Sequence, residues 1–414
     1  MRKGLIPGTW DVLAPLSNGD FVRLWLANGL WWQAMWMEMM VLGWLALELT
    51  DSPWWVQVIG FYRSIPLLLI GLLGSAITDR FKRRHLVLTL QAASVAVALS
   101  LALLLWSDNL KFWHLSVVAL AMGSIWALDW PTRRSMIPDL VGKVHTVDAM
   151  VLENFIQGFT RISGPLAAGY IMAVYGNLGA LLILVGLGLL SLLSLSGLKT
   201  DSKAPTKSLG IRATWTEVKQ GWIYIRESAP ILGVFLITIF MNVWAFPYMN
   251  LLPVFARDIF GQGPEGMGWL GAVNGIGAFI GLGVIHLGRR KLSNEWLFIL
   301  GSLISSIGVV FFALSGTYGL SLLMLFCSGL GQAGFGIMQS SIILVESSDE
   351  MRSRAMSGLV VAIGLGPFGR LQSGAMAEVW GPRIAVGVMA VMAAVGTLLA
   401  GLFLRGFAGN KKAR

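Results

Sequence analysis

Long apolar segments, separated by short clusters of charged residues or of glycine and proline, run along almost the whole chain. Each is roughly 20 residues long, the length that a helix needs to cross the hydrocarbon core of a bilayer. No segment shows the alternating pattern of an outer-membrane β-barrel strand. The pattern predicts about twelve membrane-spanning helices, at residues 21–48, 53–77, 85–106, 112–130, 147–173, 178–198, 229–256, 266–287, 293–315, 318–345, 355–378 and 383–405.

The composition excludes a water-soluble fold. The 414 residues are 56% hydrophobic and 13% charged, whereas soluble domains carry about 25% charged residues. The single cysteine, Cys327, lies inside an apolar segment, so one chain cannot form a disulfide framework or a cysteine metal site. Residues 1–19 lack the apolar core of a cleavable signal, so the first span is expected to be retained.

The net charge of +10 follows from membrane topology. If both termini are cytoplasmic, the outer side holds only Lys111, Arg257 and Arg383. Cytoplasmic loops of membrane proteins are enriched in lysine and arginine, so this asymmetry sets the orientation without a nucleic-acid partner. We expect a multi-pass protein of the cell (inner or plasma) membrane. The cytoplasmic clusters are Arg80, Lys82, Arg83 and Arg84; Arg133, Arg134 and Lys143; Arg289, Arg290 and Lys291; and Arg352 and Arg354.

A polar segment near the midpoint divides the chain into two similar halves. The second part of this linker places Trp215, Val218, Trp222 and Ile225 on one helical face, as in a helix at a membrane surface. A basic sequence, residues 78–84, follows the second span, and a similar one, residues 285–291, follows the eighth. The repeat predicts an all-α membrane fold with two six-helix bundles, residues 1–198 and 229–414, joined by a cytoplasmic linker, residues 199–228. A substrate site is expected between the bundles.

Several local sequences resemble those of a known family. The loop at residues 74–84, with Gly74, Asp79, Arg80 and a following basic pair, resembles the signature of the major facilitator superfamily. Residues 36–38 with 43–53, 131–141, 161–169 and 352–357 resemble its drug and siderophore exporter branch, related to the enterobactin exporter. The resemblance covers nearly the whole chain and implies a secondary transporter that exports small amphiphiles. Exchange for protons is not part of the resemblance, because the family often has an amide where Glu38 and Glu153 stand; we expect it from these two carboxylates themselves.

Five charged residues fall deep inside the predicted spans. A charge at the bilayer centre costs about 2.5 to 3.5 kcal/mol on insertion scales, so each is a candidate functional residue. In one interpretation Glu38 or Glu153 carries a proton and Arg161 sets its affinity. In the other, a neutralised pair only joins the first and fifth spans. Glu38 and Arg161 lie at similar depth, so we expect them to pair. The five residues are Glu38, Arg63, Glu153, Arg161 and Arg370.

The fifth span carries a polar stripe. Glu153, Gln157 and Arg161 are spaced four residues apart, so they share one side of a helix. The first and last are roughly 12 Å apart along the axis, so Gln157 or water would have to bridge them. The five deep charges sum to one positive charge, which favours an anionic or zwitterionic amphiphile. Candidate cavity residues are Trp36, Arg63, Gln157, Asn242 and Arg370, and Asn242, Asn274, Gln332 and Gln339 are candidate interhelical hydrogen bonders.

The resemblance also implies a cytoplasmic gate. Asp79 would face the start of the eleventh span near Ser353, where a helix N-terminus carries a partial positive charge, and Arg80 would pair with Asp129. The alternative is that the basic residues only set the orientation. The candidate gating residues are Gly74, Asp79, Arg80, Arg83, Arg84, Asp129 and Arg133.

Small residues mark two spans for close packing. Gly164, Pro165 and Gly169 lie on the fifth span, and Gly271 and Gly275 on the eighth. Small residues let membrane helices approach closely. We expect the fifth and eighth spans to form the interface between the halves, the alternative being generic helix packing.

No nucleotide-binding loop, metal cluster or hydrolase motif is present, so neither an enzyme nor an ATP-driven pump is expected. The proton gradient is the expected driving force, without a cofactor. The expected partners are a small-molecule substrate and the lipid bilayer, and the expected state is a monomer. An uptake permease or lysophospholipid translocator is an alternative on the same fold. A non-transporting membrane sensor is another, which the membrane carboxylates Glu38 and Glu153 disfavour.

Overall fold

The computed structural model describes residues 11–71, 81–199, 221–348 and 350–411, and within these ranges the regular structure is helical, without strands. The first half contains η1 (Asp11–Ser17), α1 (Gly19–Thr50), α2 (Pro53–Gly71), α4 (Arg83–Trp106) and α5 (Phe112–Ser196). The second half contains α7 (Ala229–Phe240), η2 (Met241–Ala245), η3 (Phe246–Leu251), α8 (Leu252–Val254), η4 (Phe255–Ile259), α9 (Pro264–Gly288), α10 (Asn294–Leu314), α11 (Tyr318–Glu346), α12 (Arg352–Gly364), α13 (Gly366–Trp380) and α14 (Pro382–Lys411).

Helix α5 contains three of the predicted spans. It is interrupted at Gly142 and Gly176, where φ is +73° and +69°. Glycine adopts positive φ without a steric penalty, so these residues divide α5 into three helical segments. The first segment was expected to end at residue 130, but it continues to the break at Gly142 and includes Pro131 and Pro138. The charged residues Asp129 and Arg133 suggested that the segment ends there. In the structure they neutralise each other, so the helix continues past them.

Seven helices of the described residues are long and apolar enough to cross a membrane. One of these is α5, which supplies three segments. Together with α1, α2 and the successive helices α12 and α13, they agree with the prediction of about twelve spans. The predicted all-α membrane fold is therefore confirmed.

Two spans of the second half have an irregular backbone. The first of them passes from α7 through η2, η3, α8 and η4, with π-helical segments and two prolines, Pro247 and Pro253. The other breaks between α12 and α13 at Leu365, two residues before Pro367. Irregular backbone at membrane depth is tolerated where it is buried in protein or lines a cavity. Both irregular stretches line the central cavity described below.

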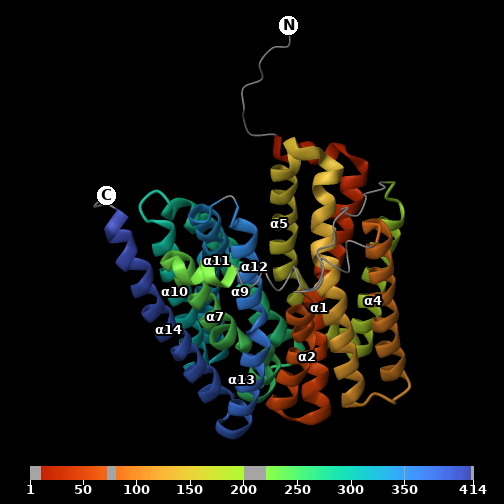
Figure 1. The fold of residues 1–414 in the computed structure, drawn as a ribbon. Helices are drawn as coiled ribbons and strands as arrows, with labels where there is room; N and C mark the ends of the chain where they lie inside the picture. Colours follow the sequence, from red (N-terminus) through yellow and green to blue (C-terminus); the bar gives the residue numbers. More distant parts are fainter. Residues whose placement is uncertain (1–10, 72–80, 200–220, 349, 412–414) are drawn as a thin grey trace.

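The helices form two bundles, one built by α1, α2, α4 and α5 and the other by α7 to α14 (Figure 1). The described end of the linker, residues 221–227, is helical. There Ile225 is buried, and the half-exposed ring of Trp222 meets Phe235 with ring centroids 5.2 Å apart. A surface helix with one apolar face stays a prediction for the linker, since Trp215 and Val218 lie outside the described residues.

The bundles meet most closely where α5 crosses α9. A β-carbon added to Gly169 would lie 2.6 Å from the carbonyl oxygen of Pro264, and one added to Gly268 would lie 2.6 Å from that of Pro165. Glycine is required there because the two backbones touch. Gly164, expected at the same interface, packs instead against Trp36 of α1 inside the first bundle.

We expect Gly169→Ala to lower the stability of the protein by about 1–3 kcal/mol, the usual cost of overpacking. The added methyl group would meet backbone atoms of α9, which cannot rotate away. The matched control is Gly186→Ala, in the next helical segment of α5, where an added β-carbon has no neighbour within 4 Å. Unfolding in detergent, followed by tryptophan fluorescence, measures both. Equal stabilities of the two variants would contradict the close contact.

Candidate functional site

A central cavity of about 400 Å³ lies between the two bundles. Most of its wall is apolar, with tryptophans and methionines from α1 and further apolar side chains from α2, η3 and α13. The five residues predicted for a substrate cavity all lie on this wall, and their contact with a substrate stays a prediction. They are Trp36, Arg63, Gln157, Asn242 and Arg370.

Glu38 forms an ion pair with Arg63. Its two carboxylate oxygens accept hydrogen bonds from Nε and Nη2 of the guanidinium, at 3.0 and 3.2 Å. Two parallel bonds of this kind give both strength and fixed geometry. The expected pair between Glu38 and Arg161 is therefore wrong. Arg63 lies on α2, which follows α1 after a short turn, and from there it reaches the carboxylate directly.

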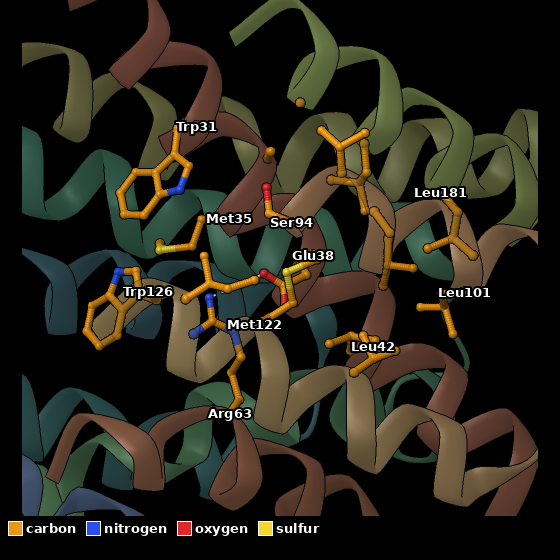
Figure 2. A pocket seen from close by; sticks show the side chains of 18 of the residues that line it. Trp31, Met35, Glu38, Leu42, Arg63, Ser94, Leu101, Met122, Trp126 and Leu181 are labelled. Atoms are coloured by element: carbon orange, nitrogen blue, oxygen red, sulfur yellow. Dashed lines mark hydrogen bonds and ion pairs between the residues drawn. The ribbon is translucent and has the colours of Figure 1, made fainter. Parts of the chain in front are cut away.

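A second, smaller cavity of about 60 Å³ lies inside the first bundle, on the other side of this ion pair (Figure 2). Its wall is mainly apolar, with Leu42, Leu101 and Leu181 among the side chains drawn in Figure 2. Arg63 lines both cavities, whereas Glu38 lines the inner one. The carboxylate therefore approaches Arg63 from the side that faces away from the central cavity.

Arg161 joins the two bundles through neutral partners. Its Nη2 donates to Oδ1 of Asn274 in α9 at 3.0 Å and to Oε1 of Gln332 in α11. The guanidinium carbon lies 5.6 Å from the ring centroid of Trp36, a cation–π distance. Its Nε is buried without a hydrogen-bond partner among the described residues. Asn274 and Gln332 are thus interhelical hydrogen-bonding residues, as their positions predicted.

Glu153 is held by neutral donors from α1. Its oxygens accept hydrogen bonds from Nδ2 of Asn28 at 3.0 Å and from Nε1 of Trp32 at 3.2 Å. A small cavity beside this carboxylate shares Trp32 and Gln157 with the wall of the central cavity. Glu153 is therefore next to the central cavity, and Gln157 lies between it and Arg161 along the helix.

Arg133 and Asp129 form the most deeply buried ion pair among the described residues. Their side chains are 2% and 0% exposed, and Nε of Arg133 lies 2.9 Å from Oδ2 of Asp129. The same guanidinium donates to Asn28 of α1 at 3.2 Å and to Gln91 of α4 at 2.7 Å, and it lies 5.2 Å from the ring of Trp31. Arg133, expected in a cytoplasmic cluster, is thus buried with its charge compensated inside the bundle, and the side of the membrane on which it lies stays a prediction.

The predicted gating residues fall into separate groups. Arg83 forms an ion pair with Asp139 at 2.6 Å, and Arg84 donates to the carbonyl oxygen of Ser196 at 3.0 Å. Both contacts join α4 to α5 inside the first bundle, and a part in gating stays a prediction. Asp129 pairs with Arg133 of its own helix. Gly74, Asp79 and Arg80 lie outside the described residues, together with the contacts expected for them.

A set of polar contacts between the bundles was not predicted. Asp51 lies 2.9 Å from Nη1 of Arg257. Glu378 of α13 accepts from the hydroxyl of Ser52 at 2.8 Å and from the backbone N–H of Trp54 at 3.3 Å, at the start of α2. A carboxylate at a helix N-terminus satisfies unpaired N–H groups and the positive end of the helix dipole. We call this end of the molecule, defined by these two contacts, the closed end.

Polar residues in apolar segments are the signal that was overlooked. Asn28 and Gln91 lie within predicted spans, and each hydrogen-bonds to the buried Arg133. Isolated polar side chains in a membrane helix usually find a partner on a neighbouring helix. Glu378 lies at the predicted boundary of a span, where a charged residue indicates only the end of the helix.

Comparisons with known proteins agree with this architecture. The family model described as transmembrane secretion effector matches residues 10–410. The staphyloferrin A transporter of Staphylococcus aureus is 24% identical over 354 residues, which cover 84% of this chain and 86% of that protein. The multidrug efflux pump Tap of Mycobacterium tuberculosis is 22% identical over 354 residues, which cover 82% of each protein.

Solved structures show the same fold at low sequence identity. The nucleoside transporter NupG has a TM-score of 0.73 at 13% identity, over 93% of this chain and 100% of that chain. A bacterial homologue of the human lysosomal transporter Spinster, solved in an inward-facing and unoccupied conformation, has a TM-score of 0.73 at 14% identity, over 93% and 98%. The expected major facilitator fold is thereby confirmed. The chain belongs to the transmembrane secretion effector family of major facilitator transporters, and it is a transporter rather than an enzyme.

Proposed function

We propose that the protein exports small amphiphilic molecules across the cell membrane by alternating access, in exchange for protons. The observation that carries the proposal is the central cavity. Residues of both bundles line it, and the membrane carboxylate Glu153 lies in a small cavity next to it. An apolar and aromatic wall with a few convergent polar groups suits a small amphiphile. Two similar halves around a shared site are the arrangement that alternating access uses.

The positive-inside pattern supports an orientation for this conformation. It assigns the closed end, with Asp51, Arg257 and Glu378, to the outside of the cell. The ribbons of the two bundles separate toward the opposite end, near which η1 and the end of α14 lie (Figure 1). In this orientation the substrate reaches the cavity from the cytoplasm, which is the state in which an exporter loads.

The similar proteins support export of a small molecule. The description of the matching family, transmembrane secretion effector, names secretion, and one relative is a multidrug efflux pump. Another relative transports staphyloferrin A. Export of drugs or of siderophore-like metabolites is therefore preferred to uptake.

The geometry favours Glu153 over Glu38 as the residue that exchanges a proton. Protonation of Glu38 would leave Arg63 without its counter-charge, and breaking a buried ion pair typically costs about 3–5 kcal/mol. Glu153 accepts hydrogen bonds from neutral donors, and a hydrogen bond to a charged group contributes about 1.5–3 kcal/mol. A neutral Glu153 therefore disturbs its surroundings less, and the small cavity beside it provides room for a proton to enter.

We expect Glu153→Gln to abolish substrate-dependent proton movement in proteoliposomes, because the amide cannot take up a proton. A pH-sensitive dye inside the vesicles reports the movement when members of a panel of drugs, dyes and catecholate siderophores are added. Glu38→Gln should retain proton movement, because the proton is exchanged at Glu153. Asp108→Asn, an exposed carboxylate between α4 and α5, is the control for loss of charge.

Loss of proton movement in Glu38→Gln and not in Glu153→Gln would make Glu38 the coupling residue. If no compound of the panel moves protons, in vesicles with a verified amount and orientation of protein, the proposed proton exchange is wrong.

We expect Glu378→Gln to open the closed end more often. A carboxylate at an exposed helix N-terminus contributes about 0.3–1 kcal/mol, so its loss should raise outward opening by about two- to fivefold. The measurement is the labelling rate of a cysteine placed at Met249 on the cavity wall, in a Cys327→Ala background, by a membrane-impermeant thiol reagent added outside the cells. Asp108→Asn should leave the rate unchanged, and an unchanged rate in Glu378→Gln would show that this contact does not hold the closed end.

A further inference from the structure

We propose that the central cavity binds an organic anion, with acidic groups that pair with Arg161 on one wall and with Arg370 and Arg63 on the other. This inference rests on the proposed transport function and names the class of its substrate. It differs from the expectation drawn from the summed membrane charge, which allowed a zwitterion. The distribution of charge around the cavity, rather than the sum, carries the new inference.

The described wall of the central cavity contains positive charges without negative ones. Its charged residues are Arg63, Arg161 and Arg370, and no aspartate or glutamate lines it. Glu38 lies behind Arg63 and lines the inner cavity, and Glu153 lines the small cavity beyond Trp32. A cationic substrate would therefore meet only like charges, whereas an anion would meet guanidinium groups.

Arg161 has no acidic partner among the described residues. Its Nη2 is bound by the side-chain oxygens of Asn274 and Gln332, and its Nε is buried without a hydrogen-bond partner in the described part of the chain. The amides orient the guanidinium but leave its charge uncompensated. A carboxylate or phosphate group of a ligand matches the planar fork of an arginine and would supply the missing counter-charge.

Arg370 extends from α13 toward α2, which packs against α13. Its Nε donates to Oδ1 of Asn250 at 3.3 Å, and its Cδ would lie 3.1 Å from a β-carbon added to Gly60. Gly60 precedes Arg63 by one turn of α2, so the glycine lets the two arginines approach on one wall. Because Glu38 compensates Arg63, one unit of positive charge remains on this wall.

The remaining wall indicates the body of the ligand. The parallel rings of Trp126 and Trp130, with centroids 5.8 Å apart, and methionines of α1 surround the arginines. Flat aromatic and flexible thioether surfaces bind aromatic or aliphatic groups of varied shape. With uncompensated charge at Arg161 and at Arg370, the arrangement fits a molecule that carries two acidic groups on an apolar body.

Binding to the purified full-length protein tests this inference with three fluorescent probes that share one aromatic body. Dansyl-glutamate carries two carboxylates, its diamide is neutral, and dansylcadaverine is a cation. Energy transfer from the tryptophans of the cavity to the dansyl group reports binding. The dianion should bind at least about tenfold more tightly than the diamide, and the cation should bind most weakly.

Variants assign the preference to the cavity. Arg161→Gln and Arg370→Gln should each weaken binding of the dianion by about tenfold or more and change binding of the diamide by less than about twofold. Arg161→Lys and Arg370→Lys should retain part of the preference, because the charge remains and the fork is lost. Arg290→Gln, exposed at the end of α9, should leave all three affinities unchanged.

Equal binding of the dianion and the diamide, or tighter binding of the cation, would overturn the inference. So would an anion preference that persists in both arginine-to-glutamine variants. If a variant fails to fold, as judged by gel filtration, the lysine variant at the same position decides. The assay needs neither a proton gradient nor a membrane. If an anion binds through the arginines but is not transported, the proposed export is refuted and the anion site stands. If the protein exports cations, the anionic class of the substrate is refuted and the proposed export stands.

Discussion

The cost of burying an arginine in a membrane organises this structure. Two arginines of the first bundle are compensated by carboxylates, Arg133 by Asp129 and Arg63 by Glu38. Removal of one partner of such a pair leaves an uncompensated charge, which is far more costly than replacing both partners together. The Arg133 pair also binds α1 and α4, so it determines how the helices of the first bundle meet. Arg161, between the bundles, follows a different rule, because amides orient it and leave its charge uncompensated.

Most of the fold could be predicted from the sequence, because hydrophobic length and the distribution of basic residues are direct consequences of the bilayer. The spans before and after Gly142 show where such prediction stops. Charged residues at 129 and 133 usually indicate the end of a span, but here they neutralise each other and the helix continues. The irregular backbone around Pro247 and Pro253 was likewise not predicted, since hydropathy reports length and not helix type.

The cavity residues were easier to predict than their partners. Gln157 and Arg370 were selected because polar groups at mid-depth are costly unless they face a cavity or another helix. Trp36 was selected as a candidate aromatic contact to the substrate. Which groups touch depends on side-chain reach and on the rotation of each helix, and neither is visible in spacing along one chain. Glu38 and Arg161 have matching depth, yet Arg63 is nearer. Glu378 was missed for a related reason, since a contact between distant span ends leaves no local pattern.

An anionic substrate changes how the proton gradient can act. A negative charge in the cavity favours the protonated form of a nearby carboxylate, because like charges repel. Binding of a proton at Glu153 and of an anion beside Arg161 therefore favour each other. The two ligands do not compete for one site, so competition cannot be the cause of proton–substrate exchange. Exchange requires instead that the two conformations differ in their proton affinity at Glu153. Trp32 and Gln157, which line both the central cavity and the small cavity beside Glu153, are the residues through which such a difference could act. The membrane potential needs no such coupling, since each negative charge that leaves a cell with a negative interior gains about 2.3 kcal/mol per 100 mV. For an anion, the electrical gradient alone can therefore drive export, and Glu153 would add the chemical gradient of protons to it.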